Sequence, residues 1–348
     1  MTVGVGLVGF GLAGRVLHAP LIAASGMDIV GVVTRQAEAV SNSFPAAEVV
    51  SDLDELLQMQ RVELVVIATP NRLHAVQAIA AVRAGRHVVV DKPMALTSID
   101  ADEIVAAAAG SDRKLLVFQN RRWDSDFLTL QRVLAEGALG ELASFEANWD
   151  RFRPAVADRW REHPEEGGGI LYDLGPHLVD QALCLFGLPD WLQADVFAQR
   201  AGAVVDDAFE IRMGIGRLRI TLRSRSLVPD NALRYRLHGT QGSLSKTGMD
   251  MQEAQLRLGM SPLDPEFGVE PRAQWAQLLT AATGETREVP PERGDWLSFY
   301  RSLRASIEHD APLEGVPGGE AGRQVIRVIE AARRSSDEGR RILRSMYA

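Results

Sequence analysis

The sequence is poor in cysteine, in long apolar runs and in net positive charge. Its single cysteine, Cys184, excludes an intrachain disulfide, and we expect a buried and inert thiol. No apolar stretch reaches the roughly twenty residues that cross a membrane, and no charged segment followed by a long apolar run opens the chain. The formal net charge of −8 is unlike that of a general nucleic-acid binder, which is basic. These absences predict a cytoplasmic protein without a membrane or nucleic-acid partner.

The 348 residues can form two domains, and the hydrophobic fraction of 46% is ordinary for a globular protein. In the first 120 residues, runs of β-branched residues alternate with alanine-rich helical stretches. The runs are 1–8, 28–33, 62–68, 87–90 and 114–118. Such continuous apolar runs are typical of parallel strands buried on both faces. We therefore expect an α/β protein in which residues 1–121 form a doubly wound, NAD(P)-binding Rossmann domain.

From about residue 140 the pattern changes to alternation. Phe145, Ala147 and Trp149 alternate with polar residues, and Leu218, Ile220 and Leu222 do the same. Period-two patterns predict half-exposed strands, so residues 122–348 should form an α+β domain with an open, mostly antiparallel sheet. Helices would cover one face, and a partner subunit is the expected cover of the other. We therefore predict a homodimer or homotetramer formed through this sheet.

A glycine-rich turn follows the first predicted strand and precedes a helix. Its residues are Gly9, Phe10, Gly11, Leu12, Ala13 and Gly14. In a dinucleotide site the first glycine permits the tight turn, the second lets backbone approach the pyrophosphate, and the third lets helix pack on strand. Residues 4–9 also have the Gly-x-Gly-x-x-Gly spacing, but too few residues precede them to form a strand. The second register is therefore the predicted cofactor turn, against the alternative of a plain glycine-rich turn.

The end of the second strand indicates which dinucleotide binds. NAD-preferring sites usually place an acid there, whereas this chain has Thr34 and Arg35 and no acid before Glu38. The planar guanidinium of Arg35 suits a 2′-phosphate. This one position favours NADP over NAD.

Two segments carry candidate catalytic residues. Asp91-Lys92-Pro93 follows the predicted strand 87–90, at the edge of the sheet where ligands bind. Asp173, His177 and Asp180 have helical spacing that puts them on one face, where an acid can orient a histidine. The alternatives are a surface lysine, a local Asp–His pair and a two-ligand metal site. No further Cys or His ligands lie nearby in sequence, so we expect no metal.

Together these motifs resemble the Gfo/Idh/MocA family, and the similarity spans essentially the whole chain. The segments that carry it are 9–14, 68–71 with His74, 91–93, 119–124, 167–177 and 329–332. His18-Ala19-Pro20 and residues 121–127 look closest to NADP-dependent scyllo-inositol-dehydrogenase-like members. The resemblance implies catalytic roles for Lys92, Asp173 and His177. It also implies cofactor contacts from Thr69, Pro70, Asn71, His74, Lys92 and Pro93. One departure is Asp91, where the family usually has Glu.

The implied reaction moves a hydride between nicotinamide and a secondary alcohol or ketone of a cyclitol, sugar or polyol. His177 would be the general acid–base, Lys92 would stabilise the substrate oxygen, and Asp173 would orient His177. Candidates for contacts with substrate hydroxyls are Asn120, Arg121, Asp150 and Asp180, each of which could equally be structural. Alternatives on the same scaffold are an NAD-dependent glycosidase, a non-catalytic cofactor sensor and a reductase of dihydrodiol substrates.

Overall fold

The computed structural model describes residues 2–157, 162–164, 167–230 and 232–348. They form two compact units. Unit 1 comprises Met1–Asn120, Met251–Phe267 and Asp295–Arg323, and unit 2 comprises Arg121–Asp250, Gly268–Gly294 and Gln324–Ala348. The chain thus passes from unit 1 to unit 2 for the first time at Arg121. Two later segments pack with unit 1, which no local sequence signal indicated.

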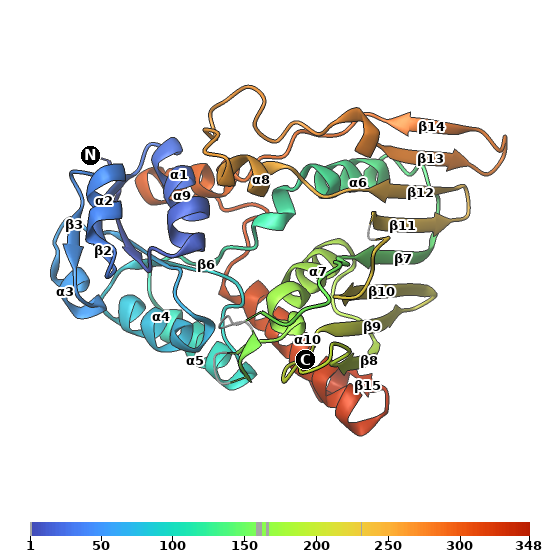
Figure 1. The fold of residues 1–348 in the computed structure, drawn as a ribbon, viewed down its shortest axis with the longest axis horizontal. Helices are drawn as coiled ribbons and strands as arrows, with labels where there is room; N and C mark the ends of the chain where they lie inside the picture. Colours follow the sequence, from blue (N-terminus) through green and yellow to red (C-terminus); the bar gives the residue numbers. More distant parts are fainter. Residues whose placement is uncertain (1, 158–161, 165–166, 231) are drawn as a thin grey trace. The chain divides into compact units, whose positions relative to one another are not determined.

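Unit 1 contains a six-stranded parallel sheet in the order β3-β2-β1-β4-β5-β6 (Figure 1). Its strands are β1 (Gly4–Val8), β2 (Asp28–Val33), β3 (Glu48–Val50), β4 (Leu64–Ile67), β5 (His87–Val90) and β6 (Leu115–Val117). Every residue of β1, β4, β5 and β6 is buried, as expected for strands covered on both faces. This is the doubly wound Rossmann architecture, and the predicted fold class is confirmed.

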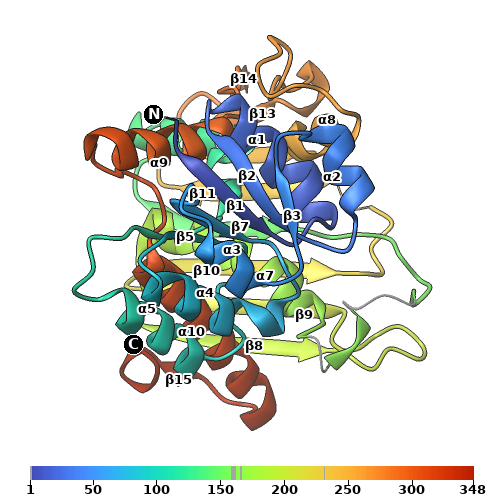
Figure 2. The same ribbon diagram turned by 90° about the vertical axis from the view of Figure 1, so that its left-hand side faces the viewer.

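Helices cover both faces of this sheet. They are η1 (Ala13–His18), α1 (Ala19–Ala24), α2 (Ala37–Ser43), α3 (Leu53–Gln58), η2 (Asn71–Leu73), α4 (His74–Arg83), α5 (Ser98–Ala108), α8 (Gln252–Arg257) and α9 (Leu297–His309). Figures 1 and 2 show α1 and α9 on one side of the strands and α3, α4 and α5 on the other. Gly31 makes room for α3, because a Cβ there would lie 2.6 Å from Leu56 Cδ1.

Unit 2 contains a nine-stranded sheet in the order β14-β13-β12-β11-β7-β10-β9-β8-β15. Its strands are β7 (Leu142–Asn148), β8 (Trp191–Phe197), β9 (Ala208–Ile215), β10 (Leu218–Arg225), β11 (Leu233–Gly239), β12 (Gly242–Thr247), β13 (Ala276–Thr280), β14 (Thr286–Val289) and β15 (Ile342–Leu343). The prediction of a mostly antiparallel sheet is confirmed. The exception is the central pair β7 and β10, which is parallel. A parallel pair needs a long connection, and the segment between these strands, which includes a helix, supplies it.

Three helices lie against one face of this sheet (Figure 1). They are α6 (Ser125–Ala135), α7 (Ile170–Phe186) and the part of α10 (Gly319–Glu338) that follows Arg323. Their apolar side chains share one core with the strands, including Phe127, Leu178 and Ile329. Three short helical turns are η3 (Asn120–Trp123), η6 (Arg272–Gln274) and η7 (Arg344–Met346). The expected open sheet with helices on one side is therefore confirmed.

The prediction that Cys184 is buried is wrong. The residue is exposed near the end of α7, whose last turns are less buried than the turns that lie in the core. Local desolvation raises the pKa of the thiol, although the nearby Arg122 guanidinium lowers it, so the net effect disfavours the thiolate.

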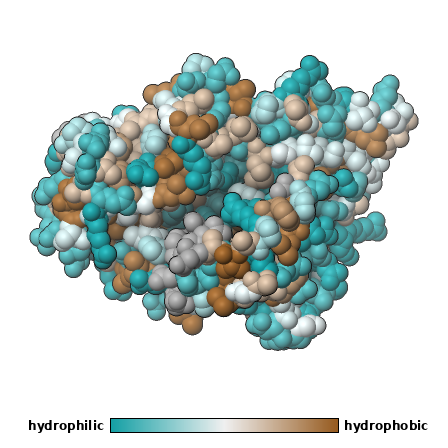
Figure 3. Space-filling view, viewed as in Figure 1, coloured by the Kyte–Doolittle hydropathy of each residue, from teal (hydrophilic) through white to brown (hydrophobic). Residues whose placement is uncertain are grey.

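The described residues contain no helix with both the length and the apolar character needed to cross a membrane. On the face drawn in Figure 3, hydrophobic residues form small groups among hydrophilic ones.

Candidate functional site

The glycine turn directly follows β1, as the sequence predicts. Gly9 has a φ of +96°, a conformation that favours glycine. A Cβ at Gly9 would lie 2.6 Å from the Ala68 carbonyl oxygen, and a Cβ at Gly14 would lie 2.1 Å from the Gly9 carbonyl oxygen. At Gly11, by contrast, a Cβ would have no atom within 4 Å. Gly9 and Gly14 are therefore needed for packing, whereas Gly11 leaves open space beside the turn.

This open space fits a dinucleotide pyrophosphate. Gly11 and Leu12 are exposed, and the helical segment of η1 and α1 begins immediately afterwards at Ala13. The first N–H groups of a helix have no partner within the helix and favour an anion. At the end of β2, the Arg35 side chain is exposed, and the Thr34 hydroxyl accepts a hydrogen bond from Gln36 N at 3.0 Å. When bound, the nicotinamide of such a cofactor supplies the hydride chemistry.

His74 joins two loops at the same edge of the unit 1 sheet. One ring nitrogen, Nδ1, lies 2.7 Å from the Pro93 carbonyl oxygen, and Nε2 lies 2.9 Å from the Thr69 carbonyl oxygen. The side chain is only 1% exposed, and this burial lowers its pKa despite the two carbonyls and Asp91. Both ring nitrogens therefore contact backbone carbonyls, and His74 connects the loops that contain Thr69 and Pro93. Pro70 is half-buried and Asn71 is buried in the same loop.

The segment Asp91-Lys92-Pro93 follows β5, and its Lys92–Pro93 peptide bond is cis. The Lys92 N–H donates to Asp91 Oδ1 at 2.7 Å, and the Lys92 side chain is half-buried. Asp91 Oδ2 lies 3.7 Å from His18 Nε2, which is too long for a hydrogen bond. Burial raises the pKa of Asp91, but His18, Lys92 and His74 outweigh that effect and lower it overall.

The second group of candidates lies on α7 of unit 2. The helix starts after Gly169, which has a φ of +101°, and Asp206 accepts from the Leu171 N–H at 2.7 Å. Asp173 is half-buried, with Oδ2 3.5 Å from Arg151 Nη1. His177, one turn further along, is buried. The predicted helix and the spacing of its polar residues are therefore present.

Trp149 and Arg234 are site residues that the sequence analysis missed. The indole of Trp149 stacks on the His177 imidazole, with ring centroids 5.3 Å apart. Two guanidinium carbons, of Arg121 and Arg234, lie 4.8 and 5.2 Å from the Trp149 ring centroid. Alternation in the sequence assigns Trp149 only to the buried face of a strand. The structure places it directly after the end of β7, within the core of unit 2.

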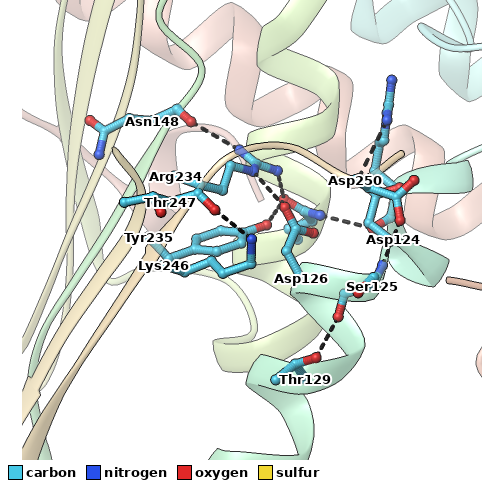
Figure 4. A network of polar contacts seen from close by, with 12 residues as sticks. Asp124, Ser125, Asp126, Thr129, Asn148, Arg234, Tyr235, Lys246, Thr247 and Asp250 are labelled. Carbon is cyan, nitrogen blue, oxygen red and sulfur yellow. Dashed lines mark hydrogen bonds and ion pairs between the residues drawn. The ribbon is translucent and has the colours of Figure 1, made fainter. Parts of the chain in front are cut away.

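Arg234 belongs to a buried polar network (Figure 4). Its guanidinium donates to Asp126 Oδ2 at 3.2 Å, to the Asn148 carbonyl oxygen at 3.1 Å and to Gln181 Oε1 at 2.9 Å. The side chains of Arg234 and Asp126 are fully buried. A buried charge is tolerated only when it is paired in this way. The network therefore fixes the Arg234 guanidinium against the Trp149 ring.

The four candidates for substrate contacts have different surroundings. Asp180 accepts two hydrogen bonds from Arg122, at 2.7 and 2.8 Å, and Asp150 pairs with Arg225 at 2.7 Å. Burial raises the pKa of Asp180, with Arg122 opposing the shift. Arg121 is buried, with Nη1 3.5 Å from Asp124 Oδ2, and Asn120 is buried at the start of η3. Both acids thus have arginine partners within the chain.

The predicted site residues divide between the units. The glycine turn, Arg35, Thr69 and Lys92 lie in unit 1, whereas His177 and Asp173 lie in unit 2. Over the part of the chain that the structure describes, no group of three His, Cys, Asp or Glu side chains could hold a metal ion.

Comparison with known proteins agrees with these features along the whole chain. Residues 3–119 match the family described as "Oxidoreductase family, NAD-binding Rossmann fold", and residues 131–343 match "Oxidoreductase family, C-terminal alpha/beta domain". The scyllo-inositol 2-dehydrogenase (NADP(+)) IolW of Bacillus subtilis (strain 168) is 39% identical over 345 residues, which cover 98% of this chain and 96% of that protein. The uncharacterized oxidoreductase YdgJ of Escherichia coli (strain K12) is 41% identical over 333 residues, 94% of each chain.

Among solved structures, yvaA from Bacillus subtilis matches with a TM-score of 0.94 and 38% sequence identity, over 99% of both chains. The family consists of NAD(P)-dependent dehydrogenases that act on CH–OH groups. Both of its domains and full-length relatives are matched, and the chain therefore belongs to the Gfo/Idh/MocA family of NAD(P)-binding oxidoreductases.

Proposed function

We propose that this enzyme is an NADP-dependent dehydrogenase of a cyclitol, sugar or polyol, with scyllo-inositol as the first substrate to test. The observation that carries the proposal is the buried imidazole of His177, a residue of α7, which stacks on the indole of Trp149. The same chain has open space for a dinucleotide pyrophosphate beside Gly11. The full-length similarity to a scyllo-inositol 2-dehydrogenase (NADP(+)) supports the substrate class.

In the proposed reaction the secondary alcohol loses a hydride to the cofactor and a proton to His177, which gives the ketone. In the reverse direction His177 returns the proton to the substrate oxygen. The Lys92 ammonium stabilises the negative charge that develops on that oxygen. Asp173, one helical turn before His177, orients the imidazole. Asn120, Arg121, Asp150 and Asp180 remain candidates for substrate contacts.

The proposed cofactor preference rests on Arg35. Its exposed guanidinium follows β2, where NAD-preferring sites usually have a carboxylate. A 2′-phosphate would pair with this guanidinium, so we propose that NADP is preferred over NAD. A cytoplasmic location and a homodimer or homotetramer through the unit 2 sheet also remain proposals.

The test is nicotinamide reduction by the purified protein on a panel of inositols, aldoses and polyols, with NADP and NAD in parallel. We expect turnover with NADP and at least one cyclitol or sugar. His177→Ala should retain cofactor binding and lose turnover, because only the proton acceptor is removed. Full activity of that variant would refute the role of His177. If no substrate of the panel supported nicotinamide reduction although the cofactor was bound, a glycosidase or a cofactor sensor would be favoured instead.

A further inference from the structure

We propose that His18 and His74 are positioning residues for Lys92, and that they hold the Asp91-Lys92-Pro93 segment from its two ends. This inference rests on the role of Lys92 in the proposed function. All of the residues concerned belong to unit 1. His18 acts on Asp91, and His74 acts on Pro93.

At the first end, a chain of polar contacts runs from α9 to Lys92. The Tyr300 hydroxyl lies 2.6 Å from His18 Nδ1, His18 Nε2 lies 3.7 Å from Asp91 Oδ2, and Asp91 Oδ1 accepts from Lys92 N at 2.7 Å. Burial raises the pKa of Tyr300 well above its ordinary value, so the phenol keeps its proton and can donate it to Nδ1. In a neutral ring the other nitrogen, Nε2, then carries the proton and faces the carboxylate.

The His18 ring is held beside Asp91 by its surroundings. It is fully buried, and its centroid lies 4.3 Å from that of Phe118 and 6.1 Å from that of Tyr300. Glutamate at position 91 would add one methylene between the backbone and the carboxylate. The buried His18 ring would obstruct that longer side chain. The short acid and the histidine are therefore a matched pair.

At the second end, His74 holds the carbonyl of Pro93, the residue after Lys92, at 2.7 Å from Nδ1. Its other nitrogen contacts the Thr69 carbonyl at 2.9 Å. The contacts of the Asp91 carboxylate and of the Pro93 carbonyl leave little room for the intervening Lys92 backbone to move. The position of the Lys92 Cα, and hence the reach of its side chain, follows from these contacts.

Both histidines also connect Lys92 to the cofactor edge. His18 is the last residue of η1, the segment that follows the glycine turn, and His74 follows the loop containing Thr69. A misplaced catalytic group can cost about a hundredfold in rate for a displacement of about 1 Å. The two histidines therefore affect turnover without contacting substrate.

The first experiment is a double-mutant cycle of His18→Ala and Asp91→Glu, measured with scyllo-inositol and NADP. We expect each single variant to lose at least about tenfold in kcat, with the Kd for NADP within about twofold of wild type. In the double variant the longer acid occupies the vacated space, so kcat should recover above both single variants. His74→Ala should likewise lower kcat more than it changes the KM for NADP.

His87→Gln is the matched control. His87 is a third buried histidine of unit 1, at the start of β5, and its ring nitrogens contact Lys114 N and Arg113 rather than the Asp91-Lys92-Pro93 segment. This variant should keep the wild-type kcat. Additive losses in the cycle, or an equal loss of kcat in the His87 variant, would overturn the proposal.

A second readout needs no substrate. The chain has only three lysines, Lys92, Lys114 and Lys246. Reductive methylation with carbon-13 therefore gives few dimethylammonium NMR signals. His18→Ala should shift or broaden the Lys92 signal and leave unchanged the signal of Lys114, whose partly exposed ammonium pairs with Asp310. An unchanged Lys92 signal would overturn the positioning role. If wild type turned over no substrate of the panel, the proposed dehydrogenase activity would be contradicted instead.

Discussion

The imidazole of His177 stacks on the indole of Trp149, with 28° between the two ring planes and 5.3 Å between their centroids. Trp149 is fixed in turn, because it is only 8% exposed and two guanidinium groups lie over its ring. The plane of a histidine ring determines where its nitrogens point. Trp149 therefore sets the direction in which His177 would exchange a proton in the proposed reaction.

Replacing Trp149 with leucine should lower kcat by about tenfold, because the imidazole loses the flat surface that orients it. Trp149→Phe keeps an aromatic face and should retain most of the activity. The measurement is steady-state kinetics of both variants with thermal unfolding as a control for folding. Equal activity of the leucine and phenylalanine variants would show that stacking does not matter for turnover.

The glycine turn permits a test that separates packing from cofactor binding. Gly14→Ala places a Cβ 2.1 Å from the Gly9 carbonyl oxygen, so we expect a loss of about 1–3 kcal/mol in the free energy of unfolding. Gly11→Ala meets no protein atom within 4 Å and should fold with unchanged stability. The methyl group would nevertheless occupy the space proposed for the pyrophosphate, so the Kd for NADP should rise at least about tenfold. Urea unfolding and calorimetric titration of both variants measure these effects.

Arg35→Ala should raise the KM for NADP selectively and leave the KM for NAD nearly unchanged. The exposed guanidinium follows β2, where a 2′-phosphate would pair with it, and NAD lacks that phosphate. The check is parallel kinetics with the two cofactors. An equal rise in both KM values would contradict the assigned cofactor preference.

His87 should make the protein less stable in acid. Burial, with Arg113 and Lys114, lowers its pKa from 6.5 to about 4. Lys114 N donates to Nδ1 at 3.0 Å, and this contact requires an unprotonated nitrogen. Between pH 6.5 and about 4 the unfolded state binds the proton and the folded state does not, so stability falls as the pH falls through this window.

Urea unfolding at about pH 7 and about pH 5 measures this loss. His87→Gln has no titrating group at the site and should lose less stability between the two conditions. His74, whose pKa is also lowered by burial, remains in the variant and accounts for part of what is left. An identical pH dependence in both proteins would exclude His87 as a contributor.

Arg234→Met should cost about 3–5 kcal/mol of the free energy of unfolding, because it leaves Asp126 as a buried carboxylate without its cation. The double variant with Asp126→Leu should recover part of that loss, since both charges are then absent. Chemical unfolding of the single and double variants decides between these outcomes. A single variant as stable as wild type would mean that the ion pair in Figure 4 contributes nothing net.

The sequence by itself determined the local structure on which the cofactor site is built. The glycine turn after β1, the Pro20 in the first turn of α1 and Gly85 after α4 are signals that each lie within a few residues of the element they shape. They act through backbone conformation, which depends on the residue itself and its neighbours. The helical spacing of Asp173 and His177 was predictable for the same reason.

Tertiary structure alone decided which side chains support the candidate catalytic residues. His18 and Tyr300 are 282 residues apart in sequence, and Arg234 is 108 residues from Asp126. The exposure of Cys184 and the parallel pairing of β7 with β10 also depend on how distant segments pack. A sequence pattern fixes which face of an element is apolar, but only the packing of whole elements determines which buried polar groups meet there.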